Sequence, residues 1–163
     1  MSAGKRPLVA LLFVISFYAA TPSLWAQQEK QLERLSKERQ RLQREDDPVG
    51  RTKTQIKVAD ILLSLIGEAV NTSDFDRMQS HLEEYLATIQ DAHNTMMKSG
   101  RDAQKKSSGF KDLEIALRRH LRQLEDIGGA LTFDQREPVE KARGQAAGIR
   151  DELLKALFGG QNV

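Results

Sequence analysis

The side chains best suited to acid–base or metal chemistry in this 163-residue chain are its three histidines, His81, His93 and His120. His81 and His93 lie twelve residues apart in one expected helix, which rotates one from the other by about 120°. One helix therefore cannot present both to a single metal ion. His120 lies at the edge of an apolar helical stripe, where a histidine is more often a partly buried polar residue than a ligand. We expect no metal site, and a carrier that uses these histidines is kept as an alternative.

Sequence patterns for other kinds of site are missing as well. The chain has no cysteine, which excludes disulfides, thiolate zinc sites, cysteine-ligated clusters and cysteine nucleophiles. It contains no Glu-x-x-His pair, no Gly-x-Ser-x-Gly and no P-loop, so the usual metal, hydrolase and nucleotide signatures are absent. Met78 and Met96 could offer sulfur to a haem, but they fall on a heptad of apolar residues and are better explained as core. We predict a non-enzymatic protein with no cofactor.

The first 26 residues have the layout of a Sec-type signal peptide. Lys5 and Arg6 precede a 13-residue apolar run from Leu8 to Ala20, and Ala26 is a small residue at a suitable distance after it. An uncleaved anchor is the alternative, although 13 residues is short against the ~20 that span a bilayer. We expect cleavage after Ala26, export to the periplasm or the extracellular space, and no membrane span afterwards.

Without this segment the chain has no net charge, so the value of +2 is no evidence for an anionic partner. Lys5 and Arg6 account for the whole net charge of +2, and the remaining chain has 23 basic and 23 acidic residues. The few remaining aromatic residues are scattered, so no platform for stacking bases is expected. A neutral, exported chain without such a platform is not expected to bind nucleic acid.

Residues 27–50 are expected to form a charged helix followed by a linker. Residues 27–47 carry six basic and six acidic side chains, with Leu32, Leu35 and Leu42 as their only apolar anchors. We interpret this strip as a loosely attached helix rather than a dimerising coiled coil, and we expect it to be dispensable for folding. The Asp-Pro and Gly residues of 46–50 should end it.

Residues 51–158 contain four amphipathic segments with a helical apolar period, and no stretch has the period of a β-strand. The strongest pattern is an unbroken alternation of three and four residues over three heptads, which consists of Phe75, Met78, Leu82, Tyr85, Ile89, Ala92 and Met96. The sequence predicts an all-α fold, namely an elongated antiparallel bundle of about four helices in up-down-up-down order, preceded by the charged helix. Residues 159–163 would be a tail.

Two local features refine this prediction. Thr72 or Ser73 is expected to cap the heptad helix. Gly144 and Gly148 lie four residues apart in the last helix, and we expect them to allow close approach of a neighbouring helix.

Charge is distributed unevenly along the chain. Residues 74–91 have a net charge of −4, from five acidic residues and one basic residue, and residues 98–122 have +5, from eight basic and three acidic residues. The two helices could pair with each other. Lys111, Arg118 and Arg122 nevertheless share one helical face, which would be a basic interaction face if it points outward.

Leu131-Thr132-Phe133-Asp134-Gln135 fits the pattern Leu-Thr-x-x-Gln, and in this segment the chain resembles the small secreted helical proteins of the periplasmic LTxxQ family. The resemblance covers one copy of a pattern that such proteins usually show twice. It implies an envelope-stress or chaperone-like role. A capping box between Thr132 and Gln135 would produce the same residues.

The sequence thus favours an exported helical bundle that binds another protein, of unknown identity, in the cell envelope, with a homo-oligomer as one possible form. A small-ligand or metal carrier in the periplasm and a chaperone-like protein of the LTxxQ type are the alternatives.

Overall fold

The computed structural model of this chain describes residues 22–159, so most of the expected signal peptide and all but one residue of the expected tail lie outside it. The described residues form five α-helices and no strand, which confirms the all-α prediction. These helices are α1 (Pro22–Leu42), α2 (Pro48–Asn71), α3 (Phe75–Met97), α4 (Phe110–Gly129) and α5 (Phe133–Phe158). None of them is both long enough and apolar enough to cross a membrane.

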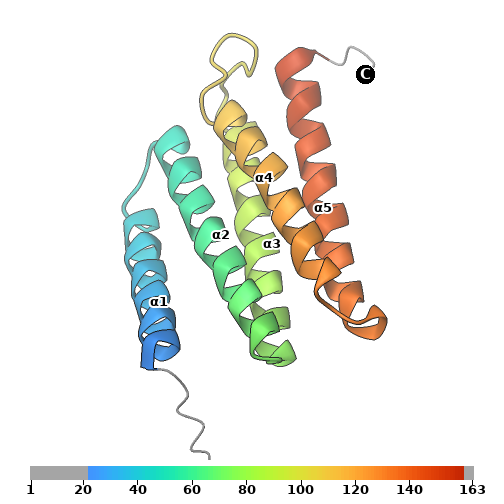
Figure 1. Cartoon of the computed structure of the whole chain (residues 1–163). Coiled ribbons are helices and arrows are strands. Elements are labelled where there is room, and N and C mark those ends of the chain that lie inside the picture. Colours follow the sequence, from blue (N-terminus) through green and yellow to red (C-terminus); the bar gives the residue numbers. More distant parts are fainter. Residues whose placement is uncertain (1–21, 160–163) are drawn as a thin grey trace, which may run out of the picture.

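The helices lie roughly alongside one another (Figure 1). The closest pairs are α2 with α3 and α4 with α5, and these pairs are joined through contacts of α3 with α5 and of α2 with α4. The backbone of α1 contacts only α2, so α1 is the outermost helix on that side.

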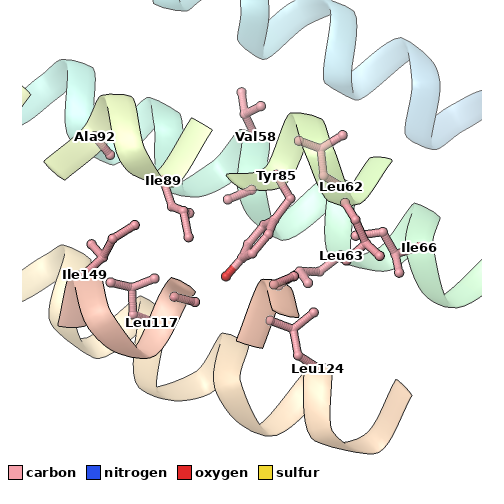
Figure 2. Close-up of a cluster of buried hydrophobic side chains, with 14 of the residues drawn as sticks. Val58, Leu62, Leu63, Ile66, Tyr85, Ile89, Ala92, Leu117, Leu124 and Ile149 are labelled. Atoms are coloured by element: carbon pink, nitrogen blue, oxygen red, sulfur yellow. The ribbon is translucent and has the colours of Figure 1, made fainter. Parts of the chain in front are cut away.

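The heptad pattern of α3 supplies the centre of the core, as predicted. From Met78 to Met96 every residue of that pattern is buried, and the stripes of α2, α4 and α5 close around it. Figure 2 shows Tyr85 and Ile89 of α3 among Leu62 and Leu63 of α2 and Leu117 of α4. Burial of these side chains is the main stabilising term of the fold, because apolar burial contributes about 25 cal/mol per Å².

Two helix starts differ from the prediction. Helix α2 begins at Pro48, inside the expected linker of residues 46–50, because a proline in the first turn has no N–H to leave unpaired and its φ suits a helix. Asp47 caps this start by accepting a hydrogen bond from the Gly50 N–H at 2.7 Å. Helix α3 is capped by Asp74, whose carboxylate accepts from the Arg77 N–H at 3.1 Å, and not by Thr72 or Ser73.

Helix α1 ends at Leu42, whereas the predicted charged strip runs to residue 47. Its one fully buried apolar contact with the core is made by a leucine. Leu35 is only 2% exposed and belongs to the same apolar cluster as the core, whereas Leu32 remains 46% exposed. An ion pair from Arg39 to Glu84 of α3 adds a polar contact. Whether α1 is dispensable for folding stays a prediction.

Two expectations for α5 are wrong. No atom outside the helix backbone lies within 4 Å of a Cβ built on Gly144 or Gly148, and both residues are exposed, so they do not mediate close helix packing. Thr132 occupies the N-cap position but its side chain makes no capping hydrogen bond. The Gln135 N–H instead donates to the Thr132 carbonyl at 3.1 Å, so the capping box is not formed.

Candidate functional site: two faces of helix α4

The inward face of α4 places a histidine in the centre of the bundle. His120 is fully buried, and its Nε2 lies 2.7 Å from Oδ1 of Asp60 on α2. Its Nδ1 lies 3.3 Å from the hydroxyl of Tyr85 on α3, and the two rings meet edge to face. His120 was expected at the edge of the stripe and partly buried. The structure corrects this, because partners from two other helices satisfy both ring nitrogens and so permit full burial.

Ionisation of Asp60 and Tyr85 fits this arrangement. Burial raises the pKa of Asp60, but hydrogen bonds from His120 and from Arg119 outweigh burial and hold the pKa below its ordinary value. Burial, with a smaller effect of the Asp60 charge, raises the pKa of Tyr85 well above its ordinary range. Asp60 is therefore a carboxylate and Tyr85 a phenol at neutral pH.

This Asp–His–Tyr chain is enclosed in the bundle. Tyr85 and His120 have no exposed surface, and only Asp60, with 39% of its side chain exposed, reaches the protein surface. A catalytic acid or base must come within hydrogen-bond distance of the substrate, and the two enclosed residues cannot. These hydrogen bonds instead link α2, α3 and α4 and fix the positions of the three helices relative to one another.

A second buried polar group joins α4 to α5. Glu114 is 3% exposed, and its carboxylate accepts from Arg118 at 2.7 Å and from Arg150 at 2.9 Å. Burial raises the pKa of Glu114, but the hydrogen bonds and charges of the two arginines outweigh burial and lower it. Sequence reasoning missed this residue, because only the spacing of four between Glu114 and Arg118 indicated a pair and nothing indicated burial.

The other two histidines do not assemble a site. His81 is partly buried, and this burial is the main cause that lowers its pKa. His93 is 6% exposed, and its Nε2 lies 3.1 Å from Glu152 without hydrogen-bond geometry. Across residues 22–159 no three His, Cys, Asp or Glu side chains come together in a way that could hold a metal ion.

The outward face of α4 contains all three residues of the predicted basic interaction face. Lys111, Arg118 and Arg122 are exposed, although Arg118 also reaches the buried Glu114. Ile115 lies among them at helical spacing and is 53% exposed. Sequence reasoning missed Ile115, even though an apolar residue four positions after Lys111 and three before Arg118 was a usable signal.

An open groove runs beside this face, between α2 and α4. Its volume is about 320 Å³, and it is lined by Lys53, Ile56, Lys57, Asp60, Asp112, Ile115, Ala116 and Arg119. Lys53 pairs with Asp112 across it, and Arg119 pairs with Asp60. Ile115 therefore belongs both to the groove and to the basic face.

The expected pairing between α3 and α4 does not form. The acidic Glu84 and Asp91 of α3 pair with Arg39 of α1 and Arg51 of α2. Within residues 22–159 no ion pair joins α3 to α4, and Lys111 and Arg122 take part in none. The acidic side chains of α3 therefore do not engage the basic face.

Searches with this chain against protein-family models, curated proteins and solved structures found no match.

Proposed function

We propose that this chain is an exported, non-enzymatic helical-bundle protein that binds another protein through the outward face of α4. In this proposal α2 to α5 form an antiparallel bundle in up-down-up-down order, which holds α4 rigid. The binding face consists of Ile115 with Lys111, Arg118 and Arg122, and the groove beside it.

One observation carries the proposal, namely that an isoleucine 53% exposed lies in the middle of a helix, between cations and beside a groove. Protein interfaces combine an apolar anchor that becomes buried with a polar rim, and arginine is enriched in them. The fitting partner is a segment with an apolar side chain that covers Ile115 and carboxylates that meet Lys111 and Arg122.

The two most exposed large apolar residues of the described chain are less suited to this role. Phe133 is 88% exposed and Phe158 is 62% exposed, but they are the first and the last residue of α5. Neither lines a groove described above. A residue at a helix end has fewer fixed neighbours than one in the middle of a packed helix, so it offers a less preorganised contact.

The buried polar groups support a binding protein over an enzyme or a metal carrier. Both ring nitrogens of His120 already have partners, at 2.7 and 3.3 Å, so neither is available to a metal or a substrate. Glu114 is likewise engaged by two arginines. Both groups act within the fold.

A comparative capture experiment tests the proposal. The triple variant Ile115→Asp, Lys111→Glu, Arg122→Glu removes the anchor and reverses two charges, and it should capture at least tenfold less of the partner from a native envelope extract than the wild type. The matched control is Phe158→Asp, Lys141→Glu, Lys155→Glu, which makes the same kinds of change on exposed residues of α5. Equal capture by all three proteins would refute the role of this face.

A further inference from the structure

Helix α1 carries a row of basic side chains along one side. Lys30, Arg34, Lys37 and Arg41 recur at spacings of four, three and four, and Arg44 continues the row just after the helix ends. At 100° per residue the four helical members lie within an arc of about 60°. All five are exposed. We call these five residues the basic row of α1.

Two acidic side chains of the same helix, Glu33 and Glu38, flank this row, but no ion pair joins them to it within the described residues. None of its five members takes part in an ion pair there. The remaining base of the helix, Arg39, lies off the row and pairs with Glu84. On the α2 side, an open groove of about 470 Å³ places Lys57 on the same surface as Arg34 and Lys37, and the acidic residues Glu38 and Asp60 line it as well.

We propose that the basic row docks α1 on an anionic lipid surface. The row contains no exposed apolar residue, because Leu35 is buried against α2 and Leu32 points to the opposite side of the helix by the same 100° rule. Protein interfaces combine charged residues with an apolar or aromatic core that becomes buried, and the row offers only charged side chains. A bilayer with anionic headgroups attracts a row of Lys and Arg without one.

Two facts about the location of the row support a membrane surface as its partner, namely its sequence distance from the apolar run and the outer position of α1 in the fold. The apolar run Leu8 to Ala20 ends ten residues before Lys30, and ten residues reach at most about 36 Å. Before the expected cleavage after Ala26, insertion of that run in a bilayer would hold the basic row within this distance of the same surface. Because α1 is the outermost helix beside α2 (Figure 1), the core does not separate the row from a flat surface.

Vesicle binding tests this proposal independently of the α4 face. The full chain is mixed with vesicles of phosphatidylcholine alone and with vesicles in which about 30% of the lipid is phosphatidylglycerol, whose headgroup is anionic. The apolar run contributes to both, so the ratio of the two partition coefficients isolates the charge effect. We expect a ratio of at least about tenfold at low salt that falls towards one at high salt, because salt screens the attraction.

A charge-reversed variant then locates the effect. Arg34→Glu, Lys37→Glu, Arg41→Glu should bring the ratio close to one, since each basic residue near an anionic surface changes partition by about fivefold. The control Lys98→Glu, Lys106→Glu, Lys155→Glu makes the same net change on exposed residues at the far ends of α3 and α5 and in the loop after α3, and should keep most of the preference. Circular dichroism melting checks that both variants are folded.

Three results would overturn the proposal. The wild type could show no preference for anionic vesicles, or both variants could lose the preference equally, which would indicate net charge rather than the row. The third is binding to immobilised polyglutamate that depends on the row without any binding to vesicles, which would assign the row to an acidic protein. In each case the proposed role of Ile115 would remain to be judged by its own variants.

Discussion

The two faces of α4 differ in the burial and pairing of their charged and polar side chains. On the inward face His120 and Glu114 are buried, and the contacts that hold them are 3.3 Å or shorter. The partners of His120 lie on α2 and α3, whereas Glu114 is held by Arg150 of α5 and by Arg118 of α4 itself. On the outward face Lys111 and Arg122 have no ion pair within the described part of the chain, and Ile115 is half exposed. Since buried polar groups must be satisfied and surface ones need not be, the inward face serves the fold and the outward face is available for binding.

This comparison makes a sharp prediction for two apolar residues two positions apart. Leu117→Ala should lower the free energy of unfolding by about 2 to 5 kcal/mol, because it removes a fully buried side chain and leaves a cavity. Ile115→Ala should change it by no more than about 0.5 kcal/mol. Chemical denaturation of both variants measures the difference, and comparable losses would mean that the outward face is part of the core.

The buried carboxylate should be the next most sensitive position. Glu114→Gln removes the charge that holds Arg118 and Arg150, so a loss of about 1 to 3 kcal/mol in unfolding free energy is expected. Glu125→Gln is the control, because its carboxylate is 68% exposed and lies 3.8 Å from Arg143, and such pairs contribute little. Equal effects of the two changes would show that burial of Glu114 carries no weight.

Acid should lower the stability of the fold by protonating the carboxylates that hold the inward face, whereas the outward cations keep their charge. The pKa values of Asp60 and Glu114 are held below their ordinary values of 3.8 and 4.5. A depressed pKa contributes stability that is complete above the ordinary value and is lost as pH falls through the folded one. Denaturation at pH 7, 5, 4 and 3 should show the decline below about pH 4.5, and the double variant Asp60→Asn, Glu114→Gln should show a shallower one.

The smallest effect on stability should come from the outward cations. Lys111→Glu with Arg122→Glu should shift the unfolding free energy by no more than about 0.5 kcal/mol, because both are exposed and unpaired. The same variant should still lose partner binding. A destabilisation above about 1 kcal/mol would show that these charges have partners in solution that support the fold.

The sequence predicted the positions of the apolar core residues better than those of the buried polar groups. The heptad from Met78 to Met96 is buried as expected, since a repeat at helical spacing reports directly which side of a helix faces the core. The burial of His120 and Glu114 was not predictable, because it depends on hydrogen-bond partners on helices distant in sequence. These partners are Asp60 for His120 and Arg150 for Glu114.

The same limit explains the errors at local positions. Gly144 and Gly148 have the spacing of a close helix contact, but which side of α5 faces a neighbour is decided by the packing of Val139, Ala142 and Ala146. The basic face of Lys111, Arg118 and Arg122 was visible in the sequence, whereas its exposure depends on how α4 lies against α2 and α5.

Position-specific crosslinking tests the central claim most directly. A photoreactive amino acid is placed at Ile115 or Arg122 on the outward face, or at the exposed Glu137 or Lys155 on α5, and the chain is irradiated in its native envelope. We predict one protein adduct of the same mass from positions 115 and 122, which disappears when Lys111 is changed to Glu, and no such adduct from 137 or 155. Adducts that are the same at all four positions, or absent at 115 and 122, would contradict the assignment of α4 as the binding face.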